Sequence, residues 1–180
     1  MLKITSAPIL IVMGVAGTGK STVAGLLAER LNWEFQEGDA LHPPANVAKM
    51  SAGIPLTDED RWPWLDAIGA WIKEKTQRGE PGILTCSALK RSYRDRLRGP
   101  NVIFVFLNGP REVIAARMAR RADHFMPPAL LNSQLATLEP PAADENVLAV
   151  DLGTTPADEV AEVLHALEQR GTESQPDPRI

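Results

Sequence analysis

The residues best suited to chemistry form one short segment near the N-terminus. Residues 14–21, with the sequence GVAGTGKS, match the pattern G-x-x-x-x-G-K-[ST] between an apolar run and a stretch of helical spacing. The glycines let successive backbone N–H groups point inward, and a following helix adds the positive end of its dipole. Such a loop binds a polyphosphate, so we expect Lys20 to bridge the β- and γ-phosphates and the Ser21 hydroxyl to bind Mg²⁺.

Several classes of nucleotide-binding protein use such a loop. A GTPase is expected to carry an Asn-Lys-x-Asp segment that recognises guanine, and the sequence has none. A mechanical ATPase is expected to carry four apolar residues that end in an acid. Val147–Asp151 fits that pattern loosely, but Asp151 is equally well explained as a turn residue at a strand end. The length of the chain favours a small-molecule kinase, and a nucleotide-gated binding module with slow hydrolysis is the alternative.

A kinase also needs a carboxylate near the acceptor hydroxyl, to orient the hydroxyl and take its proton. In open α/β sheets such groups lie at the carboxyl ends of the strands. Glu37-Gly38-Asp39 follows the second expected strand. We therefore predict that Asp39 is the base and that Glu37 is an indirect partner of Mg²⁺, with a simple turn-forming role for Asp39 as the alternative.

Basic residues stand in two places where they could bind anions. Lys90 and Arg94 follow the third expected strand and could hold an anionic substrate, or they could lie on a solvated helix face. Arg117, Arg120 and Arg121 precede an irregular stretch, where an arginine could neutralise charge on the transferring phosphoryl group. Ordinary surface arginines are the equally weighted alternative.

These groups need a scaffold, and the chain alternates short apolar runs with longer stretches of helical spacing. This alternation is typical of βαβ units around a parallel sheet. The first run has no polar alternation, as expected for a central strand covered on both faces. Helices are expected after every strand except the second. The expected strands are Ile9–Met13, Trp33–Gln36, Ile83–Cys86, Val102–Leu107 and Val147–Val150.

Two segments interrupt this alternation. Leu41–Leu56 is rich in proline and glycine and precedes a helix that we expect to begin near Asp60. An excursion of this kind usually builds a substrate wall, and we place it at about residues 40–78. A candidate lid lies at about residues 120–138. One domain is expected over residues 1–170, followed by a disordered tail over residues 171–180.

Composition limits the class of protein further. Of 180 residues, 44% are hydrophobic and 23% are charged, which is typical of one soluble domain. The single cysteine, Cys86, excludes an intrachain disulfide and suits a reducing cytoplasm. A formal charge of −4 lacks the basic surplus of a general nucleic-acid binder. The apolar run at residues 9–16 is shorter than the roughly 20 residues that cross a membrane. We therefore expect neither a nucleic acid nor a membrane as a partner.

Taken together, these motifs resemble those of the gluconate kinases, a family of P-loop small-molecule kinases related to shikimate kinase. The similarity extends from residue 14 to about residue 151 and includes motifs that general P-loop kinases lack. Besides the loop it rests on Gly38-Asp39, Leu41-His42-Pro43, Lys49-Met50, residues 53–61, Pro63-Trp64-Leu65, residues 86–90, Tyr93-Arg94, His124-Phe125, Gln134 and Leu138-Glu139.

The resemblance implies an enzyme that phosphorylates the 6-hydroxyl of D-gluconate with ATP and Mg²⁺. It also implies a three-layer α/β P-loop kinase fold with a five-stranded parallel sheet in the order 2-3-1-4-5, a helical substrate-binding excursion, a lid and a homodimer. Where the family usually has Asp-Gly-Asp, this chain has Glu37-Gly38-Asp39, a change that bears on metal affinity. The rival enzyme is a kinase for another small hydroxy acid, such as shikimate.

The candidate residues have four roles, several of them implied by the resemblance alone. The catalytic candidates are Lys20, Asp39 and Arg121, and the metal ligand is Ser21. The nucleotide candidates are Gly14, Val15, Ala16, Gly17, Thr18, Gly19, Lys20, Ser21, Thr22 and Arg117. The candidates for contact with the sugar acid are Asp39, His42, Lys49, Arg61, Ser87 and Lys90.

Overall fold

A computed structural model describes residues 7–120, 128–153 and 155–173 of the chain. Its strands and helices, in chain order, are β1 (Ile9–Met13), α1 (Lys20–Leu31), β2 (Glu34–Glu37), the 3-10 helix η1 (Gly38–Leu41), α2 (Pro44–Ser51), α3 (Asp58–Arg78), β3 (Gly82–Thr85), α4 (Arg91–Leu97), β4 (Val102–Asn108), α5 (Arg111–Ala119), α6 (Pro128–Thr137), β5 (Val147–Asp151) and α7 (Pro156–Glu173). Each strand lies within one residue of its expected bounds.

The five strands form one parallel sheet in the order β2-β3-β1-β4-β5, which confirms the predicted fold class. The central strand β1 pairs with β3 on one side and with β4 on the other, so that Ile9 stands opposite both Gly82 and Val102. All five residues of β1 are fully buried. A continuous apolar run therefore marks the strand that helices cover on both faces.

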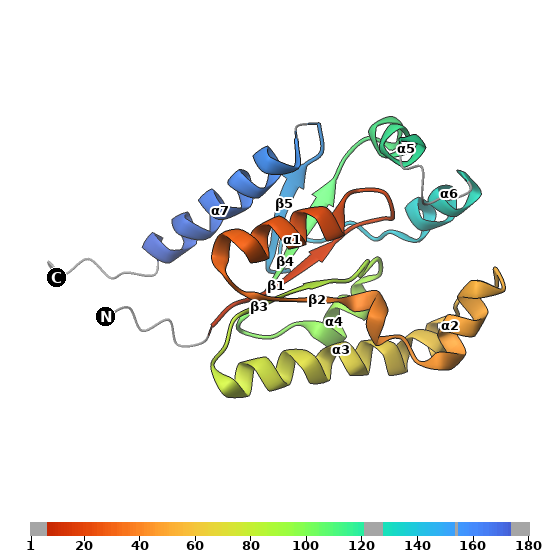
Figure 1. The fold of residues 1–180 in the computed structure, drawn as a ribbon, viewed down its shortest axis with the longest axis horizontal. Coiled ribbons are helices and arrows are strands. Elements are labelled where there is room, and N and C mark those ends of the chain that lie inside the picture. Colours follow the sequence, from red (N-terminus) through yellow and green to blue (C-terminus); the bar gives the residue numbers. More distant parts are fainter. Residues whose placement is uncertain (1–6, 121–127, 154, 174–180) are drawn as a thin grey trace, which may run out of the picture.

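Alternation along β1 divides the core into two layers. Leu10 and Val12 pack in the cluster that includes α1 and α7, whereas Ile9 and Ile11 pack in the cluster that includes α3 and α4. Figure 1 shows α1 and α7 on one face of the sheet and α3 and α4 on the other. Successive side chains of a strand point to opposite faces, so one short run serves both cores.

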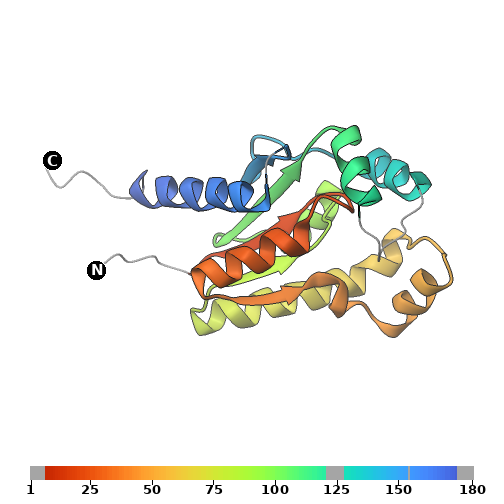
Figure 2. The ribbon, with the colours of Figure 1, turned by 45° about the horizontal axis from the view of Figure 1, so that its top comes forward.

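The elements that surround the site gather at the carboxyl ends of the strands. Figures 1 and 2 both show α5 and α6 on one side of this end and η1 and α2 on the other. The loop at residues 14–19 leaves β1 between these two groups and leads into α1. The arrangement places a nucleotide side and an acceptor side at the same edge of the sheet.

The excursion after β2 contains a helix that its proline and glycine content concealed. Pro44 is the first residue of α2, a position at which its fixed φ suits the helix and its missing N–H is not needed. The next helix, α3, begins at Asp58, two residues before the expected start, because Thr57 and Asp60 form a capping box. The excursion is therefore two helices joined by the short connection at residues 52–57.

The last helix, α7, continues through residue 173 and so includes the first three residues of the expected tail. Residues 174–180 of that tail lie outside the described residues, as do residues 121–127 of the candidate lid. Within the described ranges, no helix combines the length and the apolar character needed to span a bilayer.

Candidate active site

The loop after β1 is shaped by hydrogen bonds to its own carbonyl groups. The Lys20 Nζ atom donates to the Gly14 carbonyl at 2.9 Å and to the Val15 carbonyl at 3.1 Å. The buried Thr18 hydroxyl also donates to the Val15 carbonyl, at 2.9 Å. Gly17 has φ +82°, and a Cβ atom there would lie 2.3 Å from Met118 Cγ, so only glycine fits. With its carbonyls bonded internally, the loop can present N–H groups to an anion.

Helix α6 reaches back to this loop. The Gln134 side chain accepts a hydrogen bond from the Ala16 N–H at 2.6 Å. Ser87, at the end of β3, also contacts the loop, because its carbonyl accepts from the Gly14 N–H at 3.3 Å. Ser21 and Thr22 lie in the first turn of α1 and are exposed. The loop is thus joined both to the acceptor side and to the lid side.

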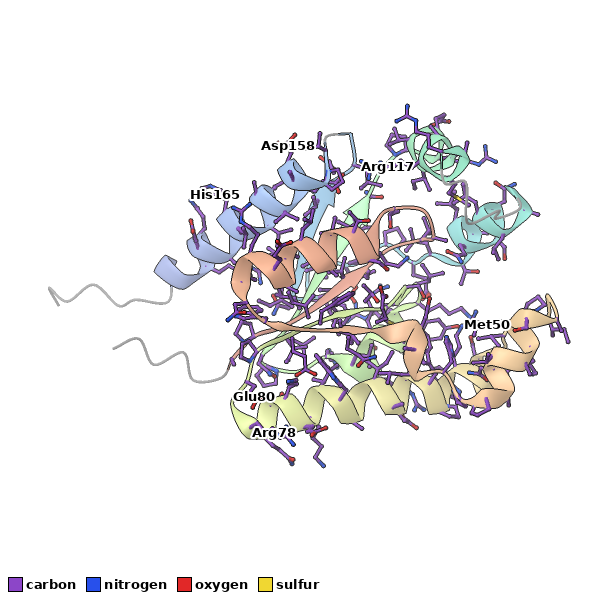
Figure 3. All side chains as sticks on the ribbon, in the orientation of Figure 1. Met50, Arg78, Glu80, Arg117, Asp158 and His165 are labelled. Carbon is purple, nitrogen blue, oxygen red and sulfur yellow. The ribbon has the colours of Figure 1, made fainter. Side chains whose placement is uncertain are left out.

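A cavity of about 370 Å³ opens beside the loop toward the start of α7. Its buried wall includes Glu159, which is fully buried, and whose Oε1 atom accepts from Arg117 at 2.8 Å. The Glu159 Oε2 atom is buried without a hydrogen-bond partner. Figure 3 shows Arg117 between α5 and the first turn of α7. The lining residues are Gly17, Gly19, Thr22, Arg117, Arg120, Thr155, Pro156 and Glu159.

The acceptor side begins where β2 and β3 end side by side. The Thr85 hydroxyl donates to Glu37 Oε2 at 2.5 Å and accepts from the Gly38 N–H at 3.1 Å. A Cβ atom on Gly38 would lie 1.8 Å from the Thr85 carbonyl oxygen, so a larger residue would force the strands apart. This close approach turns the chain at once, and the Asp39 side chain is left 88% exposed. Glu37, the expected indirect metal partner, is bound to Thr85.

Cys86 directly follows β3, and the charges of both Asp39 and Lys20 act on its buried thiol. Burial raises the pKa of the Cys86 thiol to about 12; the charge of Asp39 acts in the same direction, and the charge of Lys20 acts against it. Both charges are therefore within electrostatic range of one buried sulfur. The thiol itself stays neutral, which leaves it as a packing group rather than a nucleophile.

His42 is held in a small aromatic and polar pocket next to Asp39. Its ring stacks on Trp64 with centroids 4.2 Å apart, and Trp64 Nε1 donates to the Gly38 carbonyl at 2.8 Å. Burial lowers the pKa of His42, although Asp39 raises it in part, and Arg61 adds to the lowering. The ring is consequently neutral at pH 7 and points its Nε2 atom toward Asp39 Oδ1, 3.9 Å away.

Lys49, a predicted substrate contact, holds the two helices of the excursion together. Its Nζ atom lies 2.9 and 2.8 Å from the two carboxylate oxygens of Asp60. These bonds, together with the Thr57 backbone N–H, lower the pKa of Asp60 to about 2. The ammonium group of Lys49 is therefore already shared with a carboxylate at the start of α3.

Arg61 and Lys90 meet around one carboxylate, that of Asp58. Lys90 Nζ lies 3.2 Å from both Asp58 oxygens, and Arg61 Nη1 lies 4.0 Å from Asp58 Oδ1. The Tyr93 hydroxyl donates to the same carboxylate, and this bond, followed by the one from Lys90, lowers the pKa of Asp58. Two predicted substrate-binding cations from α3 and from the end of the β3–α4 loop thus converge, as an anion site requires.

Arg94 differs from both interpretations that its spacing allowed. It neither lies on a solvated face nor points to the acceptor, because its side chain is only 1% exposed and pairs with Glu145 at 2.6 Å. It also donates to the carbonyls of Ala88 and Leu89, at 2.9 and 3.2 Å. Ala88 has φ +47°, which a residue with a side chain seldom adopts. Arg94 therefore supports the strained loop between Ser87 and Lys90.

Several residues that form the site carried no separate signal in the sequence. Asp58, Asn46 and Glu159 are single polar residues in helices, and only their contacts with distant segments set them apart. Asp58 in the first turn of α3 reads as a helix-start acid, and Glu159 in α7 reads the same way. Arg121, a predicted catalytic residue, and His124 lie outside the described residues.

A parallel sheet in this order, with a phosphate-binding loop after its central strand and an acid after the neighbouring strand, defines a P-loop kinase. A family model described as an AAA domain matches residues 9–141. The gluconokinase of Gluconobacter oxydans is 59% identical over 143 residues, which cover 78% of this chain and 80% of that protein. This chain belongs to the gluconokinase family.

Other relatives agree. The thermosensitive gluconokinase of Escherichia coli is 48% identical over 79% of this chain and 78% of its own length. A crystal structure of a gluconokinase from Sinorhizobium meliloti superposes with a TM-score of 0.83 at 50% identity, over 92% of this chain and 94% of that one. Shikimate kinase from Aquifex aeolicus, with a TM-score of 0.60 and 18% identity over 91% of this chain and 98% of that one, shares the fold.

Proposed function

We propose that this protein transfers the γ-phosphoryl group of ATP to the 6-hydroxyl of D-gluconate. The observation that carries this proposal is that two segments meet at the end of β3: the phosphate-binding loop, joined there by the bond from the Gly14 N–H to the Ser87 carbonyl, and the turn before Asp39, joined there by the bond from the Gly38 N–H to the Thr85 hydroxyl. The membership of the gluconokinase family, with relatives of that name at up to 59% identity, supports the substrate. A loop that holds phosphates beside an exposed acid suits phosphoryl transfer.

The proposed step is an in-line displacement. The 6-hydroxyl oxygen forms a bond to the γ-phosphorus, the bond from that phosphorus to the β,γ-bridging oxygen breaks, and ADP leaves with the electron pair. Asp39 takes the proton of the hydroxyl, and its exposed carboxylate can contact a bound acceptor.

On the nucleotide side, we propose that the loop and α1 supply most of the charge stabilisation. Lys20 would exchange its contacts with the Gly14 and Val15 carbonyls for phosphate oxygens. The backbone N–H groups at residues 17–21 and the start of α1 would add fixed partial positive charges. Arg117 would lie against the base in the cavity beside Glu159.

On the acceptor side, we propose that the substrate carboxylate is bound by Arg61 and Lys90. Both cations face one anion already, namely Asp58, and they also lie over the Tyr93 ring at 5.6 and 5.7 Å from its centroid. Two cations beside one carboxylate leave one net positive charge, which favours an acid over a neutral sugar.

The same proposal includes Mg²⁺, a homodimer and a cytoplasmic location. Ser21 is the residue that would hold the ion, and a hydroxyl oxygen suits this hard cation. When bound, Mg²⁺ neutralises charge on the β- and γ-phosphates. The described residues include no group of three or more His, Cys, Asp or Glu arranged for a metal, and Mg²⁺ in kinases needs few protein ligands besides the phosphates.

A panel of acceptors assayed with ATP tests this function. We expect kcat/KM for D-gluconate to exceed that for glucose by at least about 10²-fold, because glucose has no carboxylate to pair with Arg61 and Lys90. Shikimate has a carboxylate on a ring, so its kcat/KM should also be lower, because its hydroxyls cannot take the position of an open-chain 6-hydroxyl. A higher kcat/KM for shikimate would identify shikimate, and not gluconate, as the acceptor. ADP release at the same rate with no acceptor present would instead indicate a binding module with slow hydrolysis.

A further inference from the structure

Two hydrogen bonds connect the backbone of α3 to His42 through the side chain of Asn46, and the chemistry of the groups fixes which atom donates in each. Asn46 Nδ2 lies 2.8 Å from the Asp60 carbonyl oxygen and 3.2 Å from His42 Nδ1. A carbonyl oxygen only accepts hydrogen bonds, so the Asn46 side chain must present its NH₂ group here and not its own oxygen. One hydrogen of this group binds the carbonyl, and the other points at Nδ1 of His42.

This contact decides which nitrogen of His42 carries the proton. A neutral imidazole has one donor and one acceptor nitrogen. Because Asn46 donates to Nδ1, that atom is the acceptor, and the proton lies on Nε2. The Nε2 atom is the one that faces Asp39 Oδ1 at 3.9 Å, about 1 Å longer than an N–H···O hydrogen bond. A small rotation of the exposed Asp39 side chain closes this gap.

The surroundings fix the plane of the ring, and the hydrogen bond from Asn46 distinguishes the two orientations that share this plane. The rings of His42 and Trp64 are nearly parallel, with an angle of 14° between their planes. The His42 side chain is 4% exposed, and Asn46 is buried. Burial, the largest effect, lowers the pKa of the imidazole, and the charge of Arg61 lowers it further, whereas the charge of Asp39 raises it in part; the ring therefore stays neutral. The ring therefore offers one N–H group in one direction.

We propose that Asn46 is a positioning residue that holds His42 as the Nε2–H tautomer, so that His42 donates to one carboxylate oxygen of Asp39 and leaves the other for the acceptor hydroxyl. The idea rests on the proposed function, because it takes Asp39 as the base. It also gives His42 a task different from the predicted contact with the sugar acid. A carboxylate fixed in this way offers one defined oxygen to the hydroxyl proton.

The first test measures the wild-type protein. The protein has three histidines, so long-range ¹H–¹⁵N correlation spectra of the labelled wild-type protein at neutral pH can report each ring, with His42→Gln used for assignment. We expect an unprotonated Nδ1 and a protonated Nε2 for His42. The Nδ1–H tautomer, or a doubly protonated ring, would overturn the proposal whatever the activity of the enzyme.

The second test replaces the donor to His42 Nδ1 by an acceptor. Asn46→Asp presents an acceptor to Nδ1 at nearly the same volume, so it should move the proton to Nδ1 and lower kcat by about 10-fold to 10²-fold, while KM for ATP stays unchanged. The matched control is Asn101→Asp. Asn101 is a buried asparagine beside the start of β1, and its Nδ2 atom donates to Thr76 at 2.8 Å.

The control should lose stability yet keep both the His42 tautomer and kcat. The proposal fails if Asn46→Asp leaves His42 as the Nε2–H tautomer, or if its kcat equals that of Asn101→Asp. Failure of the proposed function has a different signature: Asp39→Asn would then keep wild-type kcat with gluconate, while the tautomer of His42 would still be the one that Asn46 sets.

Discussion

The two sides of the active site are built in different ways. The nucleotide side is a run of consecutive residues whose own backbone fixes its shape, with Lys20 and Thr18 bound to carbonyls only a few residues away. The acceptor side takes its groups from η1, α2, α3 and the segment between β3 and α4, and ion pairs between these segments position them. Local geometry makes the first side, and long-range side-chain contacts make the second.

Because of this difference, the two sides should tolerate different substitutions. A loop held by hydrogen bonds to its own carbonyl groups depends on a few glycines and on the side chains that donate to those carbonyls. A site held by charged side chains depends on the helices behind it, because a shift of one helix moves a cation. The clearest example is Arg94, which touches no expected ligand group yet holds the loop that carries Lys90.

The largest effect is expected at the acid of the acceptor side. Asp39→Asn removes the proton acceptor at constant volume, so kcat with gluconate should fall by about 10²-fold to 10⁴-fold, with KM for ATP unchanged. Steady-state kinetics with each substrate varied in turn measures both quantities. A loss confined to ATP affinity would assign Asp39 to the nucleotide side and would contradict the division of the site into two sides.

A slightly smaller effect is expected at the nucleotide side. Lys20→Ala removes the cation that the loop directs toward the terminal phosphates, and kcat should fall by about 10²-fold to 10³-fold. The thermal midpoint should also fall, because the carbonyls of the buried residues Gly14 and Val15 lose the donor that they share. Wild-type turnover in this variant would show that the loop does not act on the transferred group.

The buried ion pair of Arg94 and Glu145 should contribute to the free energy of unfolding. Arg94→Ala leaves Glu145 buried without its partner, which costs about 3 to 5 kcal/mol of unfolding free energy in comparable cases. The matched control is Arg91→Ala, three residues earlier, which breaks the more exposed pair with Asp144 and should cost much less. Urea denaturation measures both. Equal losses would mean that the Arg94 pair is no more important than a surface pair.

The smallest effect concerns the junction of α2 and α3. The folded-state pKa of Asp60 is about 2, below the value of about 3.9 for an unfolded aspartate. Its contribution to stability is therefore fully present above about pH 4 and is lost as the pH falls toward 2. The difference in thermal midpoint between wild type and Asp60→Asn should shrink over this range. A difference that stays constant between pH 6 and about pH 2 would contradict the assignment.

Much of the fold followed from local patterns. The strands and their order were predictable because buried parallel strands are short apolar runs and because the motifs match a known family. The local pattern missed helix α2, although the resemblance implied a helical excursion, since Pro44 reads as a helix breaker unless it is known to be the first residue of the helix. On the acceptor side, the spacing of Arg94 fitted a ligand contact or a solvated face equally well, and only the fold placed it against Glu145.

By itself, the sequence determined the phosphate-binding loop and the acid after β2, because both depend on residues adjacent in the chain and on the ends of predictable strands. Tertiary structure alone decided which charged and polar groups meet: Asp58 with Lys90, Arg94 with Glu145, and Asn46 with His42. The physical reason is that a charge or hydrogen-bonding group has no preferred partner along the chain. Packing of distant helices selects that partner and excludes the water that would otherwise compete for it.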